Sequence, residues 1–270
     1  MKSKSIISSS SNSQIKNLVL LQKKAKAREE QGIFVVEGLK MFEEARQAGL
    51  LQKAYVSESF YQEKSEALPN YFYDLNYEVV TNSAFEDACE TKTPQGVLGT
   101  VKKATYSLES ILNAPEACIL LLEDIRDPGN LGTMIRTAEG AGITGVIVNR
   151  STVDVYNPKV VRSTMGSIYR VPFYQAEDYY EVLEEMKKKE ITLYAAHLRG
   201  IPYDSEGSFR KKSAIMIGNE ANGLSEKAAS LADVLIRIPM AGKVESLNAA
   251  VAAAILMYES SSQRRKKNNQ

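Results

Sequence analysis

Residues 214–224 read AIMIGNEANGL, and this stretch decides the fold. Its first four residues are apolar and the next seven form a polar segment with two glycines, so the pattern predicts a short buried strand that opens into a loop. Open α/β sheets bind their ligands at this edge, outside the carboxyl ends of the strands. The loop is therefore expected to form one wall of a ligand pocket.

Other short apolar runs occur throughout the second half of the chain. They cover residues 119–122, 145–148, 193–195 and 234–238, with helical patterns between them near 131–140, 157–166, 178–189 and 225–231 and a last helix over 246–260. Strands that are apolar throughout are typical of a parallel sheet covered on both faces. The second half is therefore expected to be an α/β domain.

Two further polar clusters stand where predicted strands or turns meet helices. One reads NLGTMIR over residues 130–136, and the other runs from IPM at 238–240 to SLN at 246–248. Gly218 and Gly223 permit close approach of the backbone to a ligand, and Ser246 is placed to cap the last helix. Each cluster alone fits a turn, a strand exit or a cap, but three in one domain predict a single composite site.

The first half alternates helices and strands in a smaller unit. Helices are expected over residues 15–28 and 39–48, and strands over 33–36, 54–56, 77–80 and 96–101. The boundary is expected between Lys102 and Pro115. This predicts a disordered basic N-terminus at 1–13, a first domain at 14–104, a linker at 105–116, a second domain at 117–262 and a basic tail at 263–270.

Charge is unevenly distributed, although the net charge of the 270 residues is only +1. Residues 1–28 hold seven Lys or Arg and no Asp or Glu, and the tail at 264–267 reads RRKK. Such basic segments are typical of proteins that bind a polyanion, and they are equally typical of solvated chain ends. No apolar run approaches the roughly 20 residues of a membrane span and no signal-peptide pattern precedes the first domain, so a cytoplasmic location is expected.

Several classes of functional site are disfavoured, either because the residues they need are rare or because the motif stands in the wrong order relative to the predicted helix and strand. Cys89 and Cys118 form no CxxC pair and are expected to be buried thiols. His197 is the only histidine, which argues against a zinc centre, and no Gly-x-Ser-x-Gly elbow accompanies it. The string GAGITG at 140–145 matches a dinucleotide fingerprint, but a helix precedes it and a strand follows, which is the reverse of the required order.

The three clusters resemble, in order and spacing, the motifs of the SpoU-type RNA ribose 2′-O-methyltransferases of the SPOUT superfamily. The motifs are Asn-x-Gly-x-x-x-Arg at 130–136, Gly-Asn-Glu-x-x-Gly-Leu at 218–224 and Ile-Pro-Met-x-Gly-x-x-x-Ser-Leu-Asn at 238–248. The resemblance covers residues 118–260. The first half, with Val36-Glu37-Gly38 after a basic helix, is more weakly similar to the N-terminal substrate-binding domain of the bacterial 23S rRNA branch.

This resemblance implies an architecture, a cofactor and partners. The C-terminal α/β domain would contain a deep trefoil knot, and a smaller, ribosomal-protein-like α/β domain would precede it and bind substrate. S-adenosylmethionine would bind in the knotted loops, no metal would be needed, and the catalytic domains would pair in a homodimer. The substrate would be structured RNA, with 23S rRNA favoured over transfer RNA. A non-catalytic RNA-binding protein of the same fold is a further alternative.

The resemblance also assigns roles to individual residues. The implied cofactor-binding residues are Ile217, Gly218, Asn219, Glu220, Gly223, Leu224, Ile238, Met240, Ser246 and Leu247. The implied catalytic residues are Asn130, Arg136, Glu220, Ser246 and Asn248. Ala221 stands where the family often has glycine, which is a mild change. Residues 157–163 also resemble the family pattern and are a candidate for RNA contact.

Arg136 is the residue on which the implied mechanism most depends. A guanidinium is effectively always protonated, so a phosphate clamp that stabilises the developing alkoxide is physically easier than a general base. Glu220 or Asn248 could orient the ribose hydroxyl. The sequence leaves the choice between base and stabiliser open.

Overall fold

The computed structural model describes residues 6–205, 209 and 211–268, which form two compact units. The first unit comprises the chain up to Ala104 together with Tyr156–Tyr169, and the second comprises Thr105–Val155 and the chain from Arg170 onward. The chain thus passes from one unit to the other next to the expected linker. Residues 156–169, however, were expected in the second domain and fold with the first.

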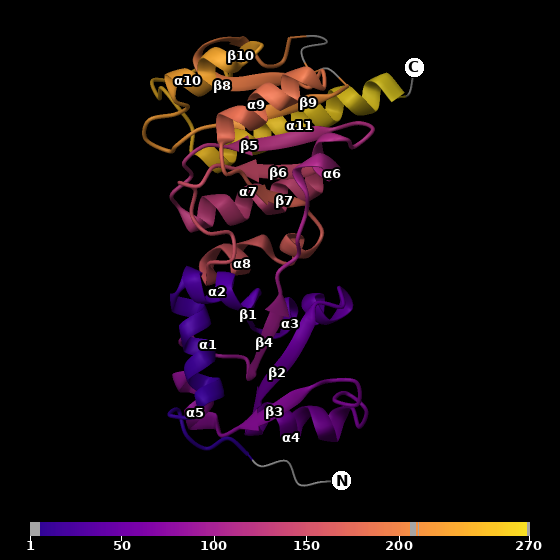
Figure 1. The fold of residues 1–270 in the computed structure, drawn as a ribbon, viewed down its shortest axis with the longest axis vertical. Coiled ribbons are helices and arrows are strands. Elements are labelled where there is room, and N and C mark those ends of the chain that lie inside the picture. The colour runs from indigo at the N-terminus through magenta and orange to yellow at the C-terminus, as the bar shows by residue number, and fades with distance from the viewer. Residues whose placement is uncertain (1–5, 206–208, 210, 269–270) are drawn as a thin grey trace. The chain divides into compact units, whose positions relative to one another are not determined.

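The first unit is built on a mixed four-stranded sheet in the order β1-β4-β2-β3 (Figure 1). β1 and β2 run antiparallel to β4, and β3 runs parallel to β2. The strands are β1 (Ile33–Glu37), β2 (Leu51–Ser57), β3 (Tyr77–Val80) and β4 (Val97–Lys102). The helices are α1 (Ser13–Lys23), α2 (Ala25–Gln31), α3 (Leu39–Gln47), α4 (Glu58–Ala67) and α5 (Asn82–Asp87).

The N-terminal segment differs from its prediction in two ways. The single helix expected over 15–28 is two helices, because Lys24 is extended at φ −124° and ψ 113°. The buried guanidinium of Arg28 donates to the carbonyls of Leu21 and Gln22 and so satisfies groups at the end of α1. The expected disorder at 1–13 does not extend to Ile7, which is buried and bridges to Val80; residues 1–5 lie outside the described part.

The inserted segment 156–169 completes the core of the first unit. It contains α8 (Pro158–Thr164) and a 3-10 turn at Ser167–Tyr169. The ring centroid of Phe34 lies 4.8 Å from that of Tyr156 and 6.4 Å from that of Tyr169. The Tyr169 hydroxyl donates to the Met41 carbonyl at 3.3 Å. The candidate RNA contact at 157–163 therefore belongs to the first unit.

The second unit is built on a six-stranded sheet in the order β10-β8-β9-β5-β6-β7, which runs from top to bottom in Figure 1. All neighbouring strands are parallel, which confirms the predicted parallel sheet. The strands are β5 (Cys118–Leu122), β6 (Gly145–Val148), β7 (Phe173–Gln175), β8 (Thr192–Pro202), β9 (Ser213–Ile217) and β10 (Val234–Arg237). The sequence pattern did not predict β7 and underestimated the length of β8.

Helices cover both faces of this sheet, which explains why its strands are apolar throughout. Ile119 and Leu121 pack in one buried cluster with residues of α6 (Leu108–Leu112), α9 (Tyr179–Lys188) and α10 (Glu226–Leu231). On the other face the Cys118 thiol lies 3.6 Å from the Ser260 hydroxyl of α11 (Ala249–Asn268), and α11 packs on α7 (Pro128–Ala141). The residues expected as a basic tail from 263 continue this helix as far as 268.

The described residues contain no helix long and apolar enough to cross a membrane. Among the same residues, no group of three or more His, Cys, Asp and Glu side chains is arranged to hold a metal ion. The polar clusters identified in the sequence lie at the carboxyl edge of the parallel sheet. The loops after β5, β6 and β9 meet there because these three strands are neighbours.

Candidate active site

The loop after β9 folds back on its own backbone. A Cβ on Gly218 would lie 2.1 Å from backbone atoms of Gly223 and Leu224, and Gly223 has a φ of +70°. Asn219 and Gly223 exchange backbone hydrogen bonds of 3.0 and 2.9 Å. Both glycines are therefore required by the loop itself: Gly218 permits close approach of backbone to backbone, and Gly223 supplies the left-handed turn.

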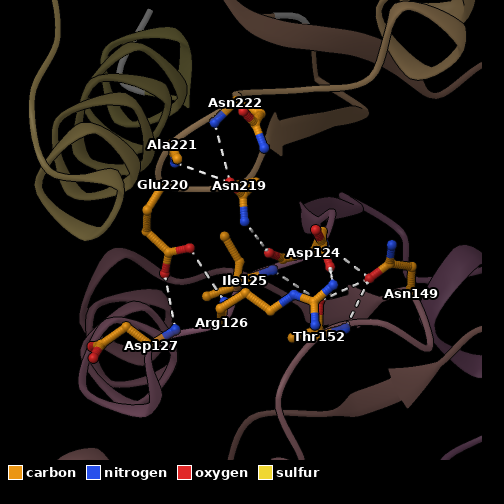
Figure 2. A network of polar contacts seen from close by, with 10 residues as sticks. All are labelled: Asp124, Ile125, Arg126, Asp127, Asn149, Thr152, Asn219, Glu220, Ala221 and Asn222. Atoms are coloured by element: carbon orange, nitrogen blue, oxygen red, sulfur yellow. Dashed lines mark hydrogen bonds and ion pairs between the residues drawn. The ribbon is translucent and has the colours of Figure 1, made fainter.

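The Asn219 side chain fixes this loop against the loop after β5 (Figure 2). Its Oδ1 accepts hydrogen bonds from the backbone N–H groups of Ala221 and Asn222 at 3.0 and 3.1 Å. Its Nδ2 donates to the Asp124 carbonyl at 2.9 Å. Because these partners are donors on one side and an acceptor on the other, they fix the orientation of the amide.

The Glu220 carboxylate is surrounded by hydrogen-bond donors. Its Oε2 accepts from the backbone N–H of Arg126 at 3.2 Å, and its Oε1 accepts from the N–H of Asp127 at 3.1 Å and from the Asn130 amide at 3.0 Å. Desolvation by burial raises the pKa of Glu220. The hydrogen bonds from Asn130 and from backbone N–H groups lower it by more than desolvation raises it, so the pKa lies below its ordinary value. Glu220 is therefore a stable carboxylate at neutral pH.

Asn248, Asn130 and Glu220 form a directional chain of hydrogen bonds. Asn248 precedes α11, and its Oδ1 accepts from the N–H groups of Ala250 and Val251 at 2.9 and 3.2 Å. Its Nδ2 must then face outward, and it donates to Asn130 Oδ1 at 3.0 Å. The Asn130 amide donates in turn to Glu220. Asn248 is thus the residue that caps α11; the prediction that Ser246 does so was wrong, because the helix begins three residues later.

These groups line an open pocket of about 670 Å³. This volume falls within the roughly 300–1,000 Å³ that is typical of small-molecule sites. The lining residues are Arg126, Asp127, Asn130, Asn219, Glu220, Ala221, Ser246, Leu247, Asn248 and Ala249. The first turns of α7 and α11 both open onto the pocket. It therefore brings together two carboxylates, those of Asp127 and Glu220, and the oriented amides of Asn130, Asn219 and Asn248.

The match to a known family decides what kind of site this is. Residues 117–258, more than half of the chain, match the model of the SpoU rRNA Methylase family. The chain belongs to this family. Residues 12–99 match a second model, the MRM3-like substrate binding domain, which covers most of the first unit.

Individual relatives of this SpoU methylase span nearly its whole length. It is 32% identical over 92% of the chain to a 23S rRNA (guanosine(2553)-2′-O)-methyltransferase of Bacillus subtilis, of which 96% is covered. The structure is similar to that of an AdoMet-bound rRNA methyltransferase from Sinorhizobium meliloti, with a TM-score of 0.83, 30% identity, and coverage of 97% of this chain and 98% of that one.

A third relative carries the same cofactor. The SpoU methyltransferase AviRb from Streptomyces viridochromogenes, in complex with AdoMet, aligns with a TM-score of 0.82 at 27% identity over 94% of this chain and 98% of that one. The α/β fold and the methylase family are therefore as the sequence motifs predicted.

Part of the predicted site of the SpoU methylase comes together in the pocket. The predicted residues that line it are Asn130, Asn219, Glu220, Ser246, Leu247 and Asn248. Ile217 and Gly218 are buried where β9 meets this loop, and Gly223 and Leu224 form the returning part of the same loop. Ile238 and Met240 follow β10 and are half-buried outside this lining. Their cofactor-binding role stays a prediction.

Arg136 is not brought to the pocket within one chain. It lies six residues beyond Asn130 on α7, which places it about 9 Å further along the helix and about 120° around it. Its side chain is exposed, and it forms no hydrogen bond or ion pair with any residue that the structure describes. The motif arginine is thus available to RNA or to another protein chain.

The pocket also includes residues that sequence reasoning missed. Asp127 caps α7, with its Oδ1 accepting from the Asn130 N–H at 2.7 Å. The Asp-Pro-Gly string at the start of that helix was a capping signal that could have identified it. Arg126 carries no such signal. Its guanidinium pairs with Asp124 at 2.6 Å while 65% of the side chain remains exposed, so only the structure places it at the pocket.

Proposed function

We propose that this SpoU methylase transfers a methyl group from S-adenosylmethionine to a ribose 2′-hydroxyl of 23S rRNA. The observation that carries the proposal is the chain Asn248–Asn130–Glu220, which places two oriented amides and an ionised carboxylate in one pocket. The Bacillus subtilis relative is named as a 23S rRNA 2′-O-methyltransferase, which supports the choice of substrate.

The pocket fits the proposed cofactor. Structures of two relatives contain AdoMet, and the cavity volume of about 670 Å³ suits a ligand of that class. When bound, S-adenosylmethionine supplies a methyl group on a positively charged sulfur. The ionised Glu220 gives the pocket the complementary charge, and the loops at 217–224, 238–240 and 246–247 are the proposed holders.

The unused hydrogen-bond donors and acceptors of the Asn130 and Asn248 amides define which bonds they can form with a ribose hydroxyl. Asn130 Oδ1 accepts one hydrogen bond, from Asn248, and so keeps a second lone pair for a hydroxyl proton. Each amide also keeps one N–H that can donate to a ribose oxygen. Since the pKa of Glu220 is lowered, its carboxylate is a weak proton acceptor. Its role in this proposal is to orient Asn130 rather than to act as the general base.

The proposed reaction also requires Arg136, which we place at a homodimer interface. Arg136 is exposed on α7, and α11, which packs on α7, carries Val251 and Tyr258, whose side chains are 48% and 49% exposed. Apolar residues seven apart on one helix form a stripe that a second copy can cover. In such a dimer the arginine adjoins the sites, where it clamps a phosphate and stabilises the developing alkoxide.

Further parts of the proposal concern substrate delivery and topology. The first unit would bind structured rRNA. Exposed lysines of its first two helices and of the residue between them would face phosphate groups; they are Lys16, Lys23, Lys24 and Lys26. The knotted connection implied by the family resemblance and the cytoplasmic location expected from the sequence belong to the same proposal.

The proposal is tested with radiolabelled S-adenosylmethionine and three RNA substrates: unmodified 23S rRNA, 16S rRNA and transfer RNA. Label should enter 23S rRNA and should be recovered as a 2′-O-methylated nucleoside after digestion. Label in transfer RNA alone would support the alternative substrate. Binding of cofactor and RNA without any transfer would identify a non-catalytic RNA-binding protein.

A further inference from the structure

The loop after β5, residues 124–127, is held by side chains from both neighbouring loops. Glu220 accepts the backbone N–H groups of Arg126 and Asp127, as described above. On the opposite side the N–H of Asp124 donates to Asn149 Oδ1 at 2.9 Å, and the N–H of Ile125 donates to Thr152 Oγ1 at 3.3 Å (Figure 2). Four consecutive backbone N–H groups are therefore satisfied by side chains that belong to other loops.

Asn149 and Thr152 form one rigid support. Asn149 Oδ1 accepts two more hydrogen bonds, from the Thr152 N–H at 3.1 Å and from the Thr152 hydroxyl at 2.9 Å. The Val153 N–H donates to the Ile125 carbonyl at 2.9 Å. Thr152 is only 4% exposed, so water has little access to these bonds. Neither Asn149 nor Thr152 lines the pocket.

Asp124 needs such support because of its backbone. Its φ is +60°, a left-handed conformation that is uncommon for residues other than glycine and persists when the surroundings fix it. Its N–H is held by Asn149 and its carbonyl by the Asn219 amide at 2.9 Å. The loop that leads to α7 therefore starts from a strained residue held from both sides.

We propose that Asn149 and Thr152 are positioning residues for methyl transfer. They fix residues 124–127, and this loop sets where α7 begins and thus where the Asn130 amide meets Glu220. This inference rests on the proposed function. It assigns a role to the loop after β6, which contributes no group to the pocket.

The decisive variant is Thr152→Val, which keeps the shape of the side chain and removes the hydroxyl that accepts from Ile125 and donates to Asn149. We expect kcat for 2′-O-methylation to fall roughly tenfold to hundredfold, because small displacements of catalytic groups have effects of this size. The KM for RNA and the Kd for S-adenosylmethionine should change less than about threefold, since the pocket lining is intact. Thr152→Ser keeps the hydroxyl and should restore kcat to within about threefold of wild type.

Thr144→Val is the matched control. Thr144 Oγ1 accepts from the Cys118 N–H at 3.0 Å and donates to the Cys118 carbonyl at 3.1 Å, at the other end of β5 from the site. This variant loses a comparable hydroxyl and should keep the wild-type kcat, even if its melting temperature falls. An equal fall in kcat in Thr144→Val, wild-type kcat in Thr152→Val, or no recovery in Thr152→Ser would overturn the positioning role.

Amide hydrogen exchange separates this inference from the proposed function. Exchange at residues 124–127 should be faster in Thr152→Val than in wild type and unchanged in Thr144→Val, whatever reaction the protein catalyses. An inactive wild-type protein would refute the proposed function alone. Unchanged exchange at residues 124–127 in Thr152→Val would refute the inference even if the wild type methylates RNA.

Discussion

Glu220→Gln is the substitution that most sharply probes the geometry of the pocket. The carboxylate accepts three hydrogen bonds on two oxygens, with Asp127 and Asn130 on one and Arg126 on the other. A glutamine has only one acceptor oxygen. If this oxygen keeps the two bonds to Asp127 and Asn130, its NH₂ group faces the Arg126 N–H, and two donors oppose each other.

The magnitude follows from this count. Hydrogen bonds to a charged acceptor contribute about 1.5–3 kcal/mol each, and the exposed position of Glu220 puts the loss of one bond at or below the lower end of that range. A loss of about 1–1.5 kcal/mol from the aligned state corresponds to a fall of roughly 5- to 10-fold in kcat. Binding of S-adenosylmethionine should weaken as well, because one of the two negative charges in the pocket lining is removed.

The assay compares single-turnover methyl transfer and cofactor titration for wild type, Glu220→Gln and the control Glu226→Gln. Glu226 is a 91% exposed carboxylate on α10 that lies outside the pocket, so its variant makes the same change of charge without touching the site. Wild-type kcat in Glu220→Gln, or an equal loss in Glu226→Gln, would refute the reasoning.

Three further predictions follow from the same geometry. Arg136→Ala should abolish methyl transfer, with a fall of at least about a hundredfold, while the Kd for S-adenosylmethionine stays nearly unchanged in calorimetry; full activity would exclude its proposed role. Gly218→Ala should disrupt the loop after β9, because the added Cβ meets backbone at 2.1 Å, and cofactor binding should be lost together with a lower melting temperature. The lowered pKa of Glu220 means that its contribution to folding stability is present above the ordinary value of 4.5 and is lost as the pH falls through the folded-state pKa. The difference in melting temperature between wild type and Glu220→Gln should therefore be largest near neutral pH and should close in acid; a constant difference would contradict the assignment.

The parallel sheet was predictable because its strands are buried on both faces, which leaves runs such as residues 119–122 and 214–217 apolar throughout. The clustering of Asn130, Glu220 and Asn248 was predictable from motif order, since the motifs follow β5, β9 and β10 at one edge. The hydrogen bonds that join these three side chains were not predictable. The directions of the two amides depend on the start of α11, which lies three residues beyond Ser246.

Other features were hidden because they depend on contacts between distant segments. Residues 156–169 read as part of the second domain, and only their packing on Phe34 and Met41 assigns them to the first unit. The support from Asn149 and Thr152 was hidden for the same reason, because the sequence gives no sign that a loop after β6 satisfies the backbone of another loop. Arg136 stays a predicted catalytic residue. Its six-residue spacing from Asn130 on one helix already implies that the two side chains point in different directions.

The central claim is that this pocket directs methyl transfer to a ribose hydroxyl of 23S rRNA. The most direct measurement is a map of 2′-O-methyl positions in 23S rRNA from cells with the gene, without it, and with the gene encoding Glu220→Gln. We expect a ribose methylation that disappears without the gene, returns with the wild-type protein and returns only in part with the variant. Identical maps with and without the gene would contradict it.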